Sequence, residues 1–559
     1  MAIAGIGALY LSYLFEAATV LLLYCIAEYF EDYIQNRARK TIETLSKFMP
    51  KTAHVIYENQ IHNVPLDSVT PKTILLIRPG ERIPIDGLIV EGFSHVDQAI
   101  ITGESMAVPK KVQDTIYAGT LNQTGVLKIC VTKQANGTLL SHIVQLVVES
   151  GKHKASIERL INKFAKIYVP IVIGIAIFTA TGLPLLIGGS FNTWLYRSLI
   201  LLVVSCPSAF IISVPATLFV AITIAAKKGA IIKGGIFVEK LAKIKRVIFD
   251  KTGTLTLGRP TVHEIHKIKN TKDPEDPLAY AAALDQHSNH PIAQAITRKA
   301  LEHDIDLTKF NVENITEIPG KGIVGQVNGK YVTVGNSKLM QEFDCNCTEI
   351  FAAIQDDIYT TVYVSVDKFG LAAISVTDEV RKDAIYTVEL LKKDNLKVAV
   401  LTGDKKETAK ETTQGLDITE VYAELFPEEK LWLVQQFKHE EGLVAMVGDG
   451  VNDAPALVAS DVGIAMGVKG VDVALESADV VLVNDELSQI PYLIKLSQKA
   501  MSIAKQNIAA SIAIKFVLGG LGLIGLIPLW FTVAAGDDGV TMLLLLNTLR
   551  LERIKHDSP

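Results

Sequence analysis

The stretch Val247-Ile-Phe-Asp-Lys-Thr-Gly-Thr-Leu-Thr256 decides the fold, because a short apolar run ends there in an aspartate followed by a glycine-containing turn. Similar runs end in acidic loops at Val398-Ala-Val-Leu-Thr-Gly-Asp404 and at Val444-Ala-Met-Val-Gly-Asp449, and a fourth run covers Asp461–Met466. Continuous apolar runs between helical patterns are typical of buried parallel strands. Because the carboxyl ends of parallel strands meet at one edge of a sheet, we expect these aspartates to converge there.

The composition excludes several classes of protein. The chain has 559 residues, of which 49% are hydrophobic, so it is too long for one compact core and too apolar for an ordinary soluble enzyme. Its 55 basic and 60 acidic residues give a net charge of −5, and we therefore expect no nucleic-acid partner. The 5 cysteines are too few and too scattered for a disulfide framework, which fits a reducing compartment.

Paired uncharged stretches predict a membrane α-helical bundle. They are Ala2–Phe15 with Ala17–Ala27, Ile167–Tyr196 with Ser198–Ala226, and Phe516–Gly536 with Gly539–Leu549. Lysines and arginines cluster where these stretches border two hydrophilic inserts, so both inserts are expected on the cytoplasmic side.

The string Asp250-Lys-Thr-Gly-Thr-Leu-Thr256 resembles the phosphorylation signature of P-type ATPases, ion pumps that use the haloacid-dehalogenase (HAD) fold. Thr102-Gly-Glu-Ser105, Thr402-Gly-Asp404 and Gly448-Asp-Gly-Val-Asn-Asp-Ala-Pro455 resemble further signatures and stand in family order. The resemblance covers essentially the whole chain. It implies a helical membrane part, a β-rich actuator domain, and a HAD-like α/β phosphorylation domain with an inserted α+β nucleotide-binding domain.

We expect the domains at the following positions. They are transmembrane helices at 1–34, N-terminally incomplete relative to the family; the actuator domain at 35–160; a transmembrane hairpin with a Cys-Pro-Ser motif at 161–228; the phosphorylation domain at 229–257 and 376–495; the nucleotide-binding domain at 258–375; and a C-terminal transmembrane hairpin at 496–553.

Phosphoryl transfer from ATP needs a nucleophile, and a carboxylate can hold the γ-phosphoryl group as an acyl phosphate. Asp250 is the candidate. The resemblance assigns Mg²⁺ to Asp250, the Thr252 carbonyl and Asp449, and it implies that Glu104 orients the water that hydrolyses the acyl phosphate. The other residues that it assigns to catalysis are Thr402, Gly403, Asp404, Lys430, Asn452 and Asp453. A solvated surface lysine remains the alternative for Lys430.

Nucleotide binding is expected in the inserted segment, where Asp285-Gln-His-Ser-Asn-His-Pro291 and Pro319-Gly-Lys-Gly322 resemble the heavy-metal branch of the family. The candidate residues are Asp285, His290, Pro291, Gly320 and Gly322, together with Lys251 and Thr252 of the phosphorylation signature. A histidine before a proline suits an exposed helix start where an imidazole meets adenine, although such a pair is often only a turn. The family usually has Glu where Asp285 stands.

A transported-metal site is indicated by Cys206-Pro207-Ser208 in an uncharged stretch. Pro207 removes one helical hydrogen bond, which predicts a free Val203 carbonyl and a locally opened helix, while Cys206 is a soft ligand. An ordinary kinked helix is the alternative. Lys515 and Asp537 resemble the membrane charges of the zinc, cadmium and lead exporters, with Asp538 as the alternative aspartate.

Two further residues bear on the choice of metal. Ser208 stands where the zinc and cadmium group has a second cysteine, which makes the site harder and weakens Cd²⁺ and Pb²⁺ relative to Zn²⁺ or Co²⁺. Glu16 resembles an exit-side acid, although a glutamate at a helix start is the simpler interpretation.

These residues together predict a monomeric, multi-pass pump of the plasma membrane that exports Zn²⁺ through an aspartyl phosphate, using ATP and Mg²⁺. Cd²⁺, Pb²⁺ and Co²⁺ remain alternative cargoes. The alternative functions are a membrane-tethered HAD-type phosphatase and a transport-incompetent metal-binding homologue.

Overall fold

The structure is a computed structural model, and it describes residues 2–26, 28–29, 50, 52–58, 60–98, 107–134, 138, 155–268, 276–288, 290–347, 359–449, 453–467 and 478–554. The chain divides into two compact units: Met1–Ile244 with Asp461–Pro559, and Lys245–Ser460. Glu104 and Asn452, both expected in catalysis, lie outside the described residues.

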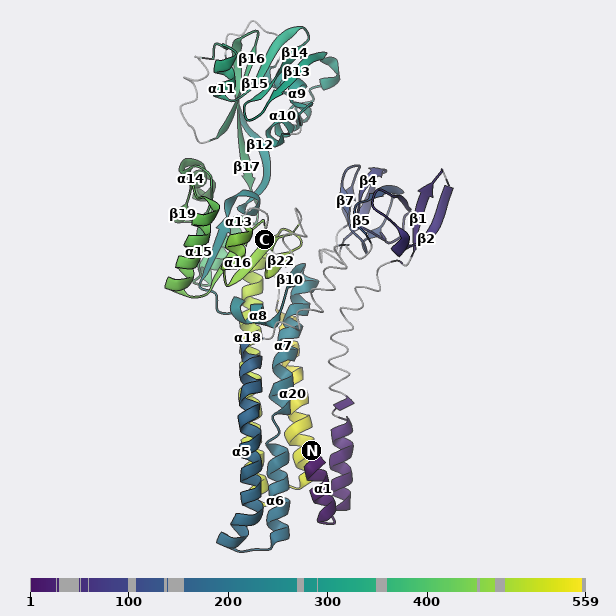
Figure 1. Ribbon diagram of the computed structural model, residues 1–559, viewed down its shortest axis with the longest axis vertical. Helices are drawn as coiled ribbons and strands as arrows, with labels where there is room; N and C mark the ends of the chain where they lie inside the picture. Colours follow the sequence, from purple (N-terminus) through teal and green to yellow (C-terminus); the bar gives the residue numbers. More distant parts are fainter. Residues whose placement is uncertain are drawn as a thin grey trace. The chain divides into compact units, whose positions relative to one another are not determined.

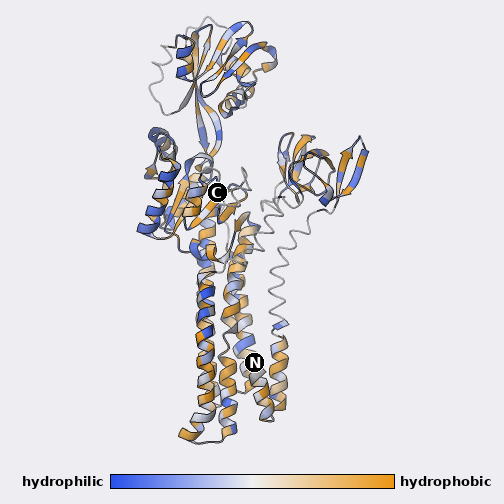
Figure 2. Cartoon of the chain, viewed as in Figure 1, coloured by the Kyte–Doolittle hydropathy of each residue, from blue (hydrophilic) through white to orange (hydrophobic). Residues whose placement is uncertain are grey.

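The first unit contains the apolar helices (Figure 1). They are α1 (Ala2–Tyr10), a helix at Leu14–Ile26, α5 (Ser156–Ile187), α6 (Phe191–Val204), α7 (Ser208–Lys227), α18 (Gln489–Ile524), α19 (Leu529–Val533) and α20 (Val540–Thr548). Three described helical segments are long and apolar enough to cross a membrane: Ser156–Ile187, Gln489–Ile524 and Leu529–Arg553. Figure 2 shows hydrophobic residues along most of the length of these helices.

The last hairpin turns inside the uncharged stretch Phe516–Gly536, which therefore does not form one helix. Helix α18 ends at Ile524, and Gly525, which caps it, has a φ of 86°, the left-handed conformation that suits glycine at a helix end. The Arg197 guanidinium donates to the Ile524 carbonyl at 3.3 Å. Lys515 consequently lies well inside α18, two and a half turns before its end.

A β-rich module follows the first helices, as the resemblance to P-type ATPases implies. It contains β1 (Thr52–Tyr57), β2 (Gln60–Pro65), β3 (Ile74–Ile77), β4 (Gly87–Glu91), β5 (Ser94–Asp97), β6 (Val108–Lys110), β7 (Thr115–Ile116), β8 (Leu121–Asn122) and β9 (Leu127–Val131). The strand orders are β2-β1-β3-β9-β4-β7 and β6-β5-β8. Leu75, Ile83, Ile89 and Ile129 are buried in its core.

The second unit contains the strand that ends in Asp250. In it β11 (Arg246–Asp250) lies between β18 (Lys397–Leu401) and β20 (Val444–Gly448), and β19 (Glu420–Tyr422) extends the sheet; all of these pairings are parallel. Near these strands in the sequence, the described residues form α13 (Ala384–Lys393), α14 (Lys406–Gln414), α15 (Pro427–Glu441) and α16 (Ala454–Ala459).

The first unit holds the strands that follow. There β21 (Val462–Met466) pairs in parallel with β22 (Val480–Leu482), which pairs with β10 (Ala230–Ile232); α8 (Gly235–Leu241) comes after β10. Each of the four apolar runs that predict parallel strands forms a strand: β11, β18, β20 and β21.

The inserted segment forms a six-stranded antiparallel sheet of order β12-β17-β16-β15-β14-β13. Its elements are β12 (Thr256–Lys267), α9 (Pro277–Asp285), α10 (Pro291–Glu302), β13 (Val312–Ile318), β14 (Gly322–Val327), β15 (Lys330–Gly335), α11 (Ser337–Glu342), β16 (Thr360–Val366) and β17 (Phe369–Val380). The pairing of Thr256 with Val380 brings both ends of the insertion together. A domain can therefore interrupt the parallel sheet without disturbing it.

Candidate phosphoryl-transfer and metal sites

Asp250 ends β11, and the parallel register sets the loops after β18 and β20 beside it. Asp250 is 5% exposed. Lys430, in the first turn of α15, places its Nζ 2.5 Å from Oδ1 of Asp250 and 2.8 Å from Oδ1 of Asp453. The surface-lysine interpretation of Lys430 is therefore wrong, because this side chain is turned into the acidic cluster.

The charges of this cluster act on one another. Burial and the negative charge of Asp453 raise the pKa of Asp250 to about 7, and Lys430 opposes that rise. Burial also raises the pKa of Asp453, again against the effect of Lys430. For Lys430 the two carboxylates outweigh the effect of burial, so its pKa is raised and it stays cationic. The single ammonium group of Lys430 thus faces two carboxyl groups, those of Asp250 and Asp453.

The residues expected to bind Mg²⁺ fit a hard divalent cation. A Cβ added to Gly253, whose φ is 76°, would lie 3.8 Å from Oδ2 of Asp449, so this carboxylate lies beside the signature loop. Asp449 also raises the pKa of Asp250 through its charge. Two carboxylates and the backbone carbonyl of Thr252 are the oxygen donors that Mg²⁺ prefers, and a cation there relieves their repulsion.

The signature loop, residues 250–256, and the residues just after it accept hydrogen bonds from, or donate them to, two side chains that sequence reasoning missed. Asp378 accepts hydrogen bonds from Thr256 Oγ1 at 2.5 Å and from the amides of Gly258 and Arg259 at 3.1 and 3.0 Å. Arg381 donates to the carbonyls of Thr254 and Gly253 at 2.8 and 3.1 Å. In the sequence, the available signal for these two residues is an aspartate and an arginine three residues apart at the end of a strand. This spacing is also common among residues on protein surfaces, so it does not indicate a role in the site.

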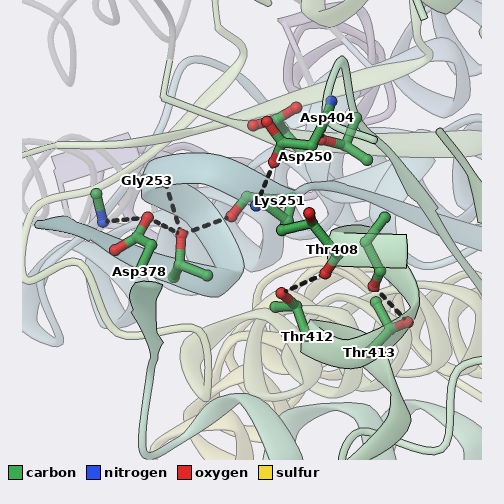
Figure 3. A network of polar contacts seen from close by, with 12 residues as sticks. Asp250, Lys251, Gly253, Asp378, Asp404, Thr408, Thr412 and Thr413 are labelled. Carbon is green, nitrogen blue, oxygen red and sulfur yellow. Dashed lines mark hydrogen bonds and ion pairs between the residues drawn. The ribbon is translucent and has the colours of Figure 1, made fainter. Parts of the chain in front are cut away.

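Lys251 and Asp404 form a salt bridge next to this loop, and Figure 3 shows both beside Asp250. The amide of Asp404 donates to Thr402 Oγ1 at 3.1 Å, which gives the Thr402-Gly403-Asp404 turn its shape. Thr402 is 2% exposed. The signature lysine thus links the loop after β11 to the loop after β18.

The residues expected to bind nucleotide lie around the start of α10. His290 is exposed and caps this helix, with Nδ1 accepting from the Ile292 amide at 3.3 Å, and Pro291 is the first helical residue. Asp285 is 4% exposed at the end of α9, where burial and the charge of Glu317 raise its pKa to about 8. His290 therefore faces solvent, whereas Asp285 lies in the interior.

The two glycines of the insertion have the conformations that this residue allows. Gly320 has a φ of 72° and Gly322 a φ of 146°. A Cβ at Gly322 would come within 2.2 Å of the Val334 carbonyl, so no larger residue fits there. Cys345 and Cys347 lie in the same domain, and burial raises the pKa of the Cys347 thiol to about 11, which disfavours a thiolate ligand.

In the membrane part, Cys206 lies in the break between α6 and α7. The expectation of a free Val203 carbonyl is wrong, because the Cys206 amide donates to it at 3.1 Å and tightens the last turn of α6. Instead, the carbonyl of Cys206 accepts from Lys515 Nζ at 2.5 Å. Ser208 begins α7.

Lys515 also contacts Asp537 at 2.9 Å, so of the two candidate aspartates this one pairs with the lysine. Lys515 is 8% and Asp537 is 6% exposed, although both belong to long apolar segments. Within the described residues, no three Cys, His, Asp or Glu side chains are gathered as a metal cage. The ammonium group of Lys515 therefore lies between the Cys206 carbonyl and the Asp537 carboxylate. Its positive charge balances the negative charge of Asp537.

Glu16, in the helix Leu14–Ile26, is held by a tyrosine that sequence reasoning missed. Tyr196 Oη lies 2.9 and 2.7 Å from the two carboxylate oxygens of Glu16, and it accepts from the Leu529 amide at 3.0 Å. A tyrosine within an apolar stretch gives no signal of such a contact, because it is common at membrane interfaces.

Two family descriptions match the chain: "P-type ATPase actuator domain" over residues 47–148 and "haloacid dehalogenase-like hydrolase" over residues 244–461. These matches define an ATP hydrolase of the P-type class. A probable cadmium-transporting ATPase of Alkalihalophilus pseudofirmus is 41% identical over 99% of this chain and 78% of its own length. A cadmium, zinc and cobalt-transporting ATPase of Bacillus subtilis is 39% identical over 100% of this chain and 78% of its own.

A crystal structure of a zinc-transporting PIB-type ATPase in the E2·Pi state is also similar. It has a TM-score of 0.68 and 33% identity, with 99% of this chain and 90% of that chain covered. The chain belongs to the family of metal-transporting P-type ATPases.

Proposed function

We propose that this protein uses ATP to export Zn²⁺ from the cytoplasm across the plasma membrane as a monomer, with its catalytic domains in the cytoplasm. The observation that carries the proposal is the contact of Lys515 with both the Cys206 carbonyl and the Asp537 carboxylate. A charged pair inside apolar helices costs free energy, so such a pair usually has a function, most often in an ion pathway.

The chemistry begins at Asp250, whose carboxylate attacks the γ-phosphoryl group of ATP, so that an acyl phosphate forms and ADP leaves. Lys430 balances the charge that collects on the phosphoryl oxygens, and Thr402 and Gly403 bind them from the neighbouring loop. Bound Mg²⁺, held by Asp250, Asp449 and the Thr252 carbonyl, would supply further charge neutralisation. Glu104 then orients the water that hydrolyses the acyl phosphate.

Transport uses the membrane site in two states. When Zn²⁺ is bound, the Cys206 thiolate and the Asp537 carboxylate are its ligands and Lys515 is displaced. When Zn²⁺ leaves, the Cys206 thiolate takes up a proton and Lys515 returns to Asp537 and the Cys206 carbonyl, so that no buried charge is left unpaired. Ser208 in place of a second cysteine makes this donor set harder, which favours Zn²⁺ over Cd²⁺ and Pb²⁺.

Vesicles reconstituted with the purified protein test the proposal. With ATP outside, those with wild-type protein should accumulate radioactive zinc, and those with Lys515→Ala or Cys206→Ala should not. Cys130→Ala is a matched control, because that cysteine belongs to β9 of the β-rich module. ATP hydrolysis that ignores Zn²⁺ and moves none would instead identify a membrane-tethered phosphatase.

A further inference from the structure

Three helices meet on the cytoplasmic side of the Lys515–Asp537 pair through a polar network. The Asn507 side chain donates to the Leu544 carbonyl at 3.2 Å and accepts from Asn547 at 2.8 Å. The hydroxyls of Thr217 and Thr548 lie 3.0 Å apart. Helices α7, α18 and α20 are thus fastened together at this depth, about 12 Å along α18 from Lys515 by the helical rise.

This network lies toward the C-terminal end of α7 and the N-terminal end of α18. The C-terminal end of α7 leads into β10, and α18 begins soon after β22. Along α18, Asn507 comes before Lys515, and along α7, Thr217 comes after Cys206. An ion that reaches the Cys206–Asp537 site from the cytoplasmic side between these helices must therefore pass the network first.

Two hydroxyls occupy the interval between the network and the ion pair. Ser511 lies one helical turn from both Asn507 and Lys515, and Ser213 lies one turn from Thr217, so both belong to the faces where these helices meet. Each is 0% exposed, and its Oγ has no hydrogen-bond partner among the described residues. By contrast, Thr217 donates to the carbonyl four residues earlier, the bond that a helical hydroxyl normally makes.

An apolar cluster lies between the same helices: Ala209 of α7 packs with Val540 and Leu544 of α20, and Ile514 of α18 packs against them. A buried hydroxyl without a partner destabilises a protein, and the cost is greater in an apolar surrounding. Two such groups in one interface suggest that they are satisfied in another state of the protein, by water or by a cation with its water shell.

We propose that Ser213 and Ser511 line the passage by which the transported divalent cation, still partly hydrated, moves from the cytoplasmic side to Cys206 and Asp537. The Asn507–Thr217–Thr548 network closes this passage. The inference rests on the proposed function. It identifies Ser213 and Ser511 as the residues that the ion meets before it reaches Cys206 and Asp537.

The test replaces Ser213 and Ser511 singly with alanine in the full chain. Alanine is as small, so packing is kept and only the hydroxyl is lost. Ser497→Ala is the matched control: Ser497 is 1% exposed on the same helix and its Oγ also has no partner among the described residues, but it lies ten residues before Asn507. Zn²⁺-stimulated ATP hydrolysis is measured against Zn²⁺ concentration, and thermal melting is measured in parallel.

The passage predicts that the Zn²⁺ concentration for half-maximal stimulation rises on the order of tenfold in Ser213→Ala and Ser511→Ala, because each variant loses one hydrogen bond to the water shell of the cation. The melting temperature should not fall, and Ser497→Ala should match the wild type. If the wild type is stimulated by Zn²⁺ but the half-maximal concentration is unchanged in both serine variants, the proposed passage is wrong and the proposed function stands. An equal rise in Ser497→Ala would have the same meaning. A wild type that ignores Zn²⁺ would overturn the proposed function and the passage with it.

Discussion

Replacing Lys430 with methionine tests how the acidic cluster prepares Asp250 for phosphorylation. Lys430 is within 2.5 Å of Asp250 and 2.8 Å of Asp453. Burial and Asp453 raise the pKa of Asp250 to about 7, although Lys430 acts in the other direction. Methionine keeps most of the side-chain length but not the charge, so the pKa of Asp250 should rise further in the variant.

The size of this rise follows from the lost contact. A hydrogen bond to a charged group contributes about 1.5–3 kcal/mol, and a pKa unit corresponds to about 1.4 kcal/mol, so the pKa should rise by roughly one to two units. The carboxylate is the reacting form. Its share at pH 7 should fall from about half to roughly 1–10%, and phosphorylation should slow about 5- to 50-fold.

The assay is the initial rate of phosphoenzyme formation from labelled ATP between about pH 6 and about pH 9, at one Mg²⁺ concentration. The variant's profile should move to higher pH, so that part of the rate returns in alkaline buffer. Lys438→Met is the control, since Lys438 lies on the same helix and donates to the Ala459 carbonyl. A rate lowered by one factor at every pH would refute the reasoning, because Lys430 would then act only on the phosphoryl group.

Three further predictions concern other parts of the protein. Glu104→Gln should let the acid-stable phosphoenzyme accumulate, and unchanged turnover would remove Glu104 from the mechanism. Cys206→Ala should abolish stimulation of ATP hydrolysis by Zn²⁺, whereas a fully responsive variant would move the metal site elsewhere. Asp285 has a folded pKa of about 8, above its unfolded value, so its contribution to stability is complete below the unfolded pKa and is lost as the pH rises toward 8. Amide protection in α9 should therefore decline between about pH 5 and about pH 8 in the wild type but not in Asp285→Asn, and equal declines would contradict this.

The catalytic edge of the sheet could be predicted from the sequence because it depends on local patterns. An apolar run predicts a buried strand, and the residue after the run lies at the edge of the sheet whatever its partners are. Asp250, Asp404 and Asp449 were found in this way. The position of Lys430 was not, because a lysine in the first turn of a helix points toward the cluster only when α15 packs beside β20, which is a tertiary contact.

The membrane part was predictable in outline but not in detail. Uncharged stretches identified the helices, yet the turn at Gly525 lies inside one of them, because hydropathy does not register backbone conformation. The choice of Asp537 over Asp538 likewise depended on how α19 and α20 are rotated against α18. Tyr196 and the hydroxyls of Ser213 and Ser511 could not be predicted, since partners and missing partners are properties of packed helices.

Labelling with radioactive ATP tests directly whether one acyl phosphate couples ATP to the metal. We expect an acid-stable label that requires Zn²⁺ and that is lost in Asp250→Asn. In Cys206→Ala the label should either disappear or form without Zn²⁺. A label that persists in Asp250→Asn, or that forms to the same extent with and without every divalent metal offered, would contradict this coupling.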